Sequence, residues 1–145
     1  LIVLIAFVAL LNGVVGTLPD VAGAPLTLER IAGWVFAPIA WLMGIPWAEA
    51  QTTGSLLGIK SILNEFIAFL QLAEMPAGAL SEHSRLITVY AIAGFANLSS
   101  IGIQISGIGA MAPERRHDLA NLGFRALVAA TLAACMNGAI VGIVA

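Results

Sequence analysis

One stretch of the sequence constrains the fold more than any other, because it places polar and glycine residues inside an apolar run. The apolar run covers residues 86–111, which is the length of a membrane-spanning helix. Its middle, residues 94–104, carries two side-chain amides, two hydroxyls and two glycines where a lipid-facing helix would carry leucines. Unpaired polar groups are costly in hydrocarbon, so these residues are expected to face other protein or a water-filled cavity. The pattern predicts a broken transmembrane helix over residues 85–111, with an opened centre at residues 95–100.

A second interpretation is that the small residues of this run only let helices approach closely, each hydroxyl bonding back to its own helix. The residues of this kind are Gly94, Ala96, Ser99, Gly102 and Ser106. Asn97 favours the broken helix, because its amide needs roughly four hydrogen bonds and a straight helix packed in lipid leaves most of them unmade. Broken helices of this kind form substrate and ion sites in secondary transporters.

The composition indicates an all-α integral membrane protein. Hydrophobic residues make up 60% and charged residues 10% of the sequence, and the mean hydropathy is +1.00, whereas soluble domains are roughly 25% charged. A formal net charge of −2, without a basic cluster, gives no sign of a nucleic-acid partner. The single cysteine, Cys135, cannot form an internal disulfide.

The first residues predict a transmembrane helix over residues 1–17 whose beginning is missing. The sequence has no initiator methionine, and no charged residue precedes the apolar run. Gly16 and the turn around Pro19 are expected to end this helix.

An interfacial helix is predicted over residues 27–43. Trp34 and Trp41 lie seven residues apart, on one helical face, and tryptophans concentrate at the headgroup level of a membrane. The alternative is a full transmembrane span kinked at Pro38, although this apolar run is shorter than the roughly 20 residues that a span needs.

Residues 48–75 predict a re-entrant helical hairpin with its tip near residues 64–65. The run is apolar enough to enter the membrane, yet holds Lys60, Asn64 and Glu65 near its centre. A straight span would place two charges in hydrocarbon, at roughly 2.5–3.5 kcal/mol each. The alternative is an ion pair between Lys60 and Glu65 on a straight helix, but their spacing of five is not the favourable three or four.

The basic residues of the loops predict the orientation. Three of the six lie in or just after the loop of residues 113–118. By the positive-inside rule this loop is cytoplasmic and the C-terminus is external. The last transmembrane helix, predicted over residues 119–145, is rich in alanine and glycine and is expected to be a packing helix.

The sequence gives no sign of an enzyme. His83 and His117 lie in opposite loops and cannot share a metal ion, and no cysteine cluster, phosphate-binding loop or dinucleotide-binding glycine pattern is present. Ser99 and Ser100 have no histidine or lysine nearby in the sequence to activate them. One carboxylate, two amides and two hydroxyls in a membrane cavity instead suit the binding of a neutral, hydroxyl-rich solute.

Two stretches of the sequence resemble signature stretches of the concentrative nucleoside transporter family. They are GIKSILNEF at residues 58–66 and YAIAGFANLSSIGI at residues 90–103. The basic turn at residues 113–116 resembles the turn found in the bacterial branch of that family. The resemblance implies the C-terminal portion of a multi-pass symporter of the plasma (inner) membrane, coupled to sodium or protons and assembled as a homotrimer.

The resemblance also implies the roles of four residues. Glu65 and Asn97 would hydrogen-bond the ribose hydroxyls, Ser100 would reach the sugar, and Phe95 would pack against the ligand. The family's nucleobase-recognising motif and sodium ligands belong to earlier segments that this sequence lacks, so no cofactor or metal is expected in this portion. The competing hypothesis is a non-transporting membrane pore or scaffold subunit, in which Glu65 and Asn97 would tolerate alanine.

Overall fold

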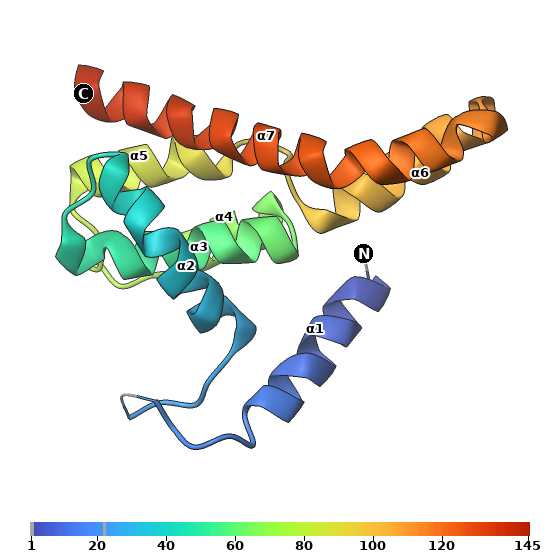
Figure 1. The fold of residues 1–145 in the computed structure, drawn as a ribbon. Coiled ribbons are helices and arrows are strands. Elements are labelled where there is room, and N and C mark those ends of the chain that lie inside the picture. Colours follow the sequence, from blue (N-terminus) through green and yellow to red (C-terminus); the bar gives the residue numbers. More distant parts are fainter. Residues whose placement is uncertain (1, 22) are drawn as a thin grey trace.

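The chain is a set of α-helices joined by short connections (Figure 1). The structure is a computed structural model, and it describes residues 2–21 and 23–145. Its helices are α1 Ile2–Val15, α2 Leu28–Leu42, α3 Trp47–Ile62, α4 Glu65–Glu74, α5 Glu82–Ile92, α6 Leu98–Met111, the 3-10 helix Pro113–Arg115 and α7 Arg116–Val144. Leu1, the first residue of the helix predicted at residues 1–17, lies outside the described residues. The prediction of an all-helical protein is confirmed.

The long α7 organises the other helices. In Figure 1 it runs along one side of the molecule, with α6 folded back along its first half and α5 lying along its second half. The helices α2, α3 and α4 gather beneath α5. The side chain of Asn12 links α1 to α2: its Nδ2 lies 3.0 Å from both carboxylate oxygens of Glu29, and its Oδ1 accepts the backbone N–H of Leu28.

Glycines bring α2 and α3 into backbone contact. A Cβ atom on Gly54 would lie 2.5 Å from the carbonyl oxygen of Gly33 and 2.8 Å from the backbone nitrogen of Ala37. A Cβ atom on Gly58 would overlap Ala32. Because no side chain fits between the two helices here, their backbones pack directly on each other.

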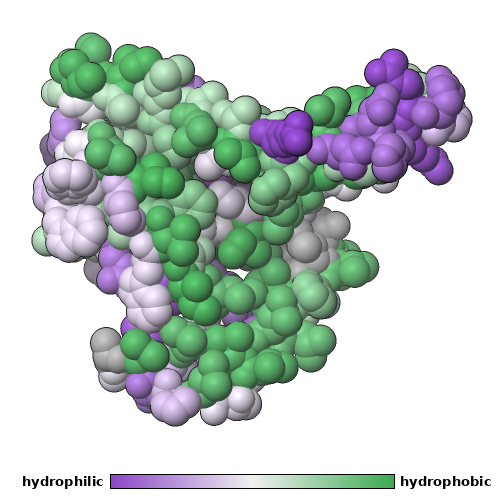
Figure 2. All heavy atoms as spheres, viewed as in Figure 1, coloured by the Kyte–Doolittle hydropathy of each residue, from purple (hydrophilic) through white to green (hydrophobic). Residues whose placement is uncertain are grey.

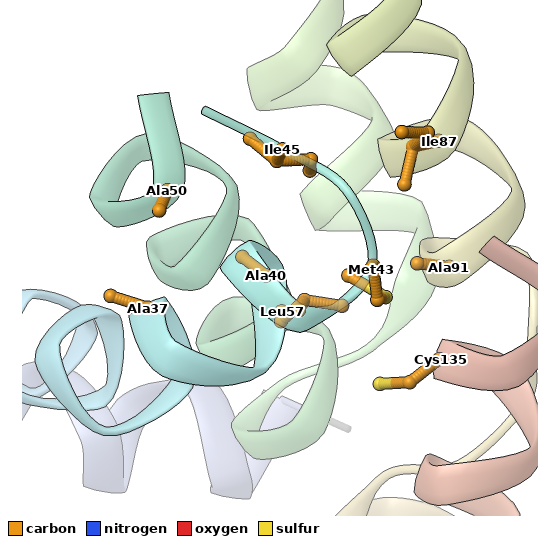
Figure 3. Packing of buried hydrophobic residues seen from close by; sticks show 9 residues of the cluster. All are labelled: Ala37, Ala40, Met43, Ile45, Ala50, Leu57, Ile87, Ala91 and Cys135. Carbon is orange, nitrogen blue, oxygen red and sulfur yellow. The ribbon is translucent and has the colours of Figure 1, made fainter. Parts of the chain in front are cut away.

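The interior around this interface is mostly apolar and contains a buried hydroxyl pair. Figure 3 shows the main cluster, which joins α2, α3, α5 and α7; its members are Ala37, Ala40, Met43, Ile45, Ala50, Leu57, Ile87, Ala91 and Cys135. Between α3 and α5, the hydroxyls of Thr53 and Thr88 lie 3.0 Å apart, and Thr88 also donates to the carbonyl oxygen of Ser84 at 2.6 Å. Since a hydroxyl has one hydrogen, Thr53 is the donor in the threonine pair.

One helical stretch of the described residues, Pro113–Val144, is long and apolar enough to cross a membrane, at 32 residues. Large apolar side chains of α7 remain exposed, among them Phe124, Leu132 and Ile143. Figure 2 shows hydrophobic atoms over much of the visible face and hydrophilic atoms gathered where α6 meets α7. An apolar surface of this extent marks contact with lipid or with further protein.

The hairpin turn and the helix break differ in detail from the sequence predictions. At the turn only Leu63 and Asn64 are non-helical, so Glu65 is the first residue of α4. The straight-helix alternative for Lys60 and Glu65 is therefore wrong. The opened centre lies at residues 93–97 rather than 95–100, because Asn97 caps α6 and lets helix begin again at Leu98.

Candidate functional site

Two helices begin at the same place, and an asparagine caps each of them. The Oδ1 atom of Asn64 accepts the backbone N–H of Ile67 at 2.9 Å, which caps α4. The Oδ1 atom of Asn97 accepts the backbone N–H of Ser100 at 2.8 Å, which caps α6. Asparagine is a preferred N-cap because its side-chain oxygen satisfies a backbone donor that the first turn of a helix leaves free. The partial positive charges of two helix N-termini therefore lie close together.

Glu65 lies between these two helix ends. Its Oε2 atom accepts a hydrogen bond from Asn97 Nδ2 at 3.0 Å, which joins residues 32 positions apart in the sequence. Asn97 is only 3% exposed, whereas Glu65 is half-buried. The Asn97 side chain thus uses its oxygen to cap α6 and its nitrogen to bond Glu65 of α4.

The Ser100 hydroxyl and the Phe95 carbonyl group complete the polar side of the site, and the Phe95 ring adds an apolar face. The Ser100 hydroxyl lies 3.0 Å from Asn97 Oδ1 and 3.1 Å from the carbonyl oxygen of Phe95. It can donate to only one of them at a time and keeps its lone pairs free to accept. The Phe95 ring is 78% exposed, so an aromatic face stands open beside the polar groups.

These residues line a groove of about 1260 Å³, here called the tip groove. The tip groove is bounded by Asn64 and Glu65 at the start of α4, by Phe95, Asn97 and Ser100 at the start of α6, and by Val3 and Phe7 of α1. All four predicted site residues therefore lie together on it. The two α1 residues were not predicted, because nothing in their apolar sequence reports a contact with segments so distant in the chain.

The small residues of the broken helix serve different purposes. A Cβ atom on Gly94 would lie 2.9 Å from Ala134 Cβ, and Ser106 Oγ bonds back to the carbonyl oxygen of Gly102 at 2.8 Å. The close-packing interpretation therefore holds for Gly94 and Ser106. It does not hold for Gly102, which has no such neighbour within 4 Å among the described residues, nor for Asn97, which contacts the hairpin.

The chemistry of the tip groove suits a ligand that donates hydrogen bonds. A carboxylate accepts short, strong bonds from hydroxyl groups, and its second oxygen is not engaged by Asn97. Within the described residues, no three His, Cys, Asp or Glu side chains cluster in a way that could hold a metal ion. The groups present can bind and orient a polar solute.

Comparisons with known proteins place the chain in a family. The family model described as "Na+ dependent nucleoside transporter C-terminus" matches residues 1–142. The uncharacterized transporter YutK of Bacillus subtilis is 43% identical over 143 residues, which cover 98% of this chain and 35% of that relative. The sodium/nucleoside cotransporter 1 of Mus musculus is 35% identical over 160 residues, with 99% of this chain and 24% of the relative covered.

Solved structures agree with the sequence relatives. CNTnw in an inward-facing substrate-bound state has a TM-score of 0.83 at 41% identity, covering 97% of this chain and 35% of that one. A variant of CNTnw in the intermediate 2 state has a TM-score of 0.91 at 39% identity, covering 99% of this chain and 36% of that one.

The chain thus spans about a third of the length of the relatives that it matches, or less. The names of these relatives describe transporters rather than enzymes, as the sequence predicted. The resemblance seen in GIKSILNEF and YAIAGFANLSSIGI is confirmed by a match over almost the whole chain. The chain belongs to the concentrative, Na+ dependent nucleoside transporter family and corresponds to the C-terminal portion of its members.

Proposed function

We propose that this chain supplies the ribose-binding side of the substrate site in a cation-coupled nucleoside symporter. The observation that carries the proposal is the 3.0 Å hydrogen bond from Asn97 Nδ2 to Glu65 Oε2, made where α4 and α6 both begin. A bond between two helix ends holds a carboxylate and an amide in one fixed arrangement. Such preorganised polar groups at the N-termini of half-helices are a feature of transporter sites.

In this proposal the ribose hydroxyls donate to Glu65 and accept from the second N–H of Asn97 Nδ2, the first being bonded to Glu65. Neighbouring hydroxyls of a sugar can reach one carboxylate and one amide at the same time, since a hydroxyl both donates and accepts. The two helix N-termini stabilise the negative charge of Glu65. Ser100, beside Asn97, reaches the sugar directly or through a water molecule.

Phe95 has a different part in the proposed site. Its exposed ring offers an apolar face on which the ligand can pack while Glu65 and Asn97 hold the hydroxyls. An aromatic face beside polar groups is typical of small-molecule sites, where few polar contacts fix the orientation and apolar contact gives area.

Membership of a transporter family and the length of α7 mark this as an integral membrane protein. We propose that α1 and α7 span the plasma (inner) membrane, that α5 and α6 form a broken span, and that α3 and α4 form a re-entrant hairpin. The helix α2 would lie at the interface, where the half-exposed Trp34 and Trp41 suit the headgroup level. The loop of residues 113–118 would be cytoplasmic and the C-terminus external, in a homotrimer.

The coupling ion is proposed as a co-transported substrate, either sodium or a proton. The Na+ dependence in the description of the family supports sodium. We propose that the ligands of a sodium ion belong to the remainder of the protein, and that the portion described here contributes the ribose side alone.

The proposal is tested by uptake of radiolabelled uridine into vesicles that hold the full-length protein, with and without a sodium gradient. We expect sodium-driven uptake that is lost in Glu65→Gln and in Asn97→Ala. Glu82→Gln and Asn121→Ala are matched controls on exposed positions and should transport normally. Uptake driven only by a proton gradient would mean that the coupling ion is a proton and not sodium. Absence of uptake under either gradient by inserted wild-type protein, or full uptake by both site variants, would favour the pore or scaffold alternative.

A further inference from the structure

A buried lysine lies directly behind the proposed site. Lys60 belongs to α3, five residues before Glu65, and its side chain is 0% exposed. Its Nζ atom has no hydrogen-bond partner among the described residues. A buried ammonium is costly unless an opposite charge or a set of acceptors compensates for it, so the surroundings of this atom decide its function.

The Nζ atom lies where three segments of the chain meet. It is 3.8 Å from the position of a Cβ atom on Gly94, in the opened centre of the broken helix. The same Gly94 position is 2.9 Å from Ala134 Cβ on α7. A side chain on residue 94 would occupy the space between α7 and the lysine. The end of the Lys60 side chain therefore lies beside the helix break.

The negative groups around Lys60 belong to the site. The break follows the C-terminal end of α5, where the carbonyl groups carry partial negative charge. Glu65 begins α4 just after the turn that follows Lys60, and it accepts a hydrogen bond from Asn97, three residues after Gly94. In α2, Glu29 is bonded to Asn12 and Arg30 to loop carbonyls, while α6 carries no charged residue. Among the described residues Lys60 forms no direct ion pair, and Glu65 is the carboxylate at the hairpin tip that follows it.

We propose that Lys60 is a positioning residue for the nucleoside site: its ammonium, held behind the helix break, is the counter-charge that keeps the Glu65 carboxylate in place against Asn97. The proposal rests on the function proposed for Glu65. Lys60 does not contact the ligand in this arrangement. It acts through Glu65, and it holds the hairpin tip and the broken helix in register.

The test uses the full-length protein in four forms: wild type, Lys60→Met, Glu65→Gln and the double variant. Methionine keeps an unbranched side chain of similar length and removes the charge. For uridine binding we expect Lys60→Met to raise Kd about tenfold or more, within the range of the coupling between two neighbouring groups. In the Glu65→Gln background, where uptake is lost but binding can still be measured, the same change should raise Kd no further, because Lys60 acts through that carboxylate. The matched control is Ser61→Ala: the Ser61 hydroxyl is also buried without a partner among the described residues, and the Kd of this variant should stay within about twofold of wild type.

The midpoint of thermal unfolding of the same four proteins gives a second readout that does not depend on transport. Removing the Glu65 charge should lower the midpoint while Lys60 is present and should have little effect, or raise it, in the Lys60→Met background. If Lys60→Met does not insert, the double variant should recover insertion, since it removes both charges.

The proposal is overturned if the effects of the two substitutions simply add in both readouts, or if the double variant fails to recover an uninserted Lys60→Met protein. If wild-type protein takes up no uridine, the proposed function fails, but the unfolding midpoints still show whether Lys60 and Glu65 are coupled.

Discussion

Small or polar residues interrupt apolar sequence in two regions, the α2–α3 interface and the meeting point of α4 and α6. The structural results in the two regions are opposite. At the first, Gly54 lets its own backbone approach that of Gly33 so closely that no side chain could fit between them. At the second, Asn64 and Asn97 end one segment and begin another, and their side chains replace the missing helical bonds. The first region is closed, and the second borders an open groove.

The difference teaches what a side-chain amide does that a glycine cannot. A glycine removes an obstacle, so two intact helices can approach. An asparagine supplies an acceptor for a backbone N–H, so a helix can stop and start again inside the protein without leaving buried donors unpaired. An interruption capped in this way places polar side chains at the edge of an open groove, whereas the glycine contacts leave no such space.

The largest effect is expected from Asn97→Asp, which separates the two functions of the amide. Aspartate still caps α6, but it cannot donate to Glu65 and places a second carboxylate about where the 3.0 Å bond was made. We expect uridine uptake, measured as Vmax/KM, to fall about hundredfold, about 2.8 kcal/mol, while the protein still inserts. Near-normal uptake would mean that capping alone is what the site needs from this residue.

The closed region is tested by Gly54→Ala. The added methyl would meet the backbone of α2, and overpacking of this kind costs about 1–3 kcal/mol. We expect a lower midpoint of thermal unfolding, with unchanged uptake per folded molecule. Gly13→Ala is the control: within the part of the chain that the structure describes, nothing lies within 4 Å of a Cβ atom there, so the midpoint should not fall. Equal behaviour of the two variants would contradict close packing of α2 on α3.

The buried threonine pair predicts unequal effects of two similar substitutions. Thr88→Val leaves Thr53 with a buried donor and no acceptor, at about 1–3 kcal/mol. Thr53→Val leaves Thr88 still bonded to Ser84 and should cost less. The comparison needs only the unfolding midpoints of both variants. Thr53→Val being the more damaging would reverse the assigned direction of the hydrogen bond.

The smallest effect is expected from loss of the cap on α4. Asn64→Ala should cost about 1 kcal/mol, because one backbone donor loses its partner, and Asn64→Ser should recover most of it. Both are measured by the unfolding midpoint and by KM for uridine. An Asn64→Ala loss as large as that of Asn97→Asp would mean that Asn64 binds the ligand as well as capping the helix.

The sequence singles out candidate site residues because polar groups in apolar runs are rare and costly. Glu65, Asn97, Ser100 and Phe95 were all chosen on this basis or by resemblance, and the structure brings them to one groove. The prediction placed the opened centre too late, at residues 95–100. Asn97 was read as the middle of an opening, whereas it is the cap that ends the opening.

Other features depend on contacts between distant segments and could not be predicted. The glycines of α2 and α3 match one another only once the helices cross, and the sequence does not state which helices cross. Val3 and Phe7 are ordinary apolar residues until α1 reaches the tip groove. The position of Lys60 beside the helix break likewise depends on how the hairpin packs against the break, although the sequence did show that a charge there needs compensation.

The most direct measurement compares the binding of uridine and of 2′,3′-dideoxyuridine to the full-length wild type and to Glu65→Gln. If Glu65 accepts hydrogen bonds from the ribose, the wild type should bind uridine far more tightly than 2′,3′-dideoxyuridine. Glu65→Gln should lose most of that preference, because the variant removes the acceptor of the same hydrogen bond whose donor the dideoxy compound lacks. An equal preference for uridine in both proteins would contradict the ribose site at the meeting point of α4 and α6.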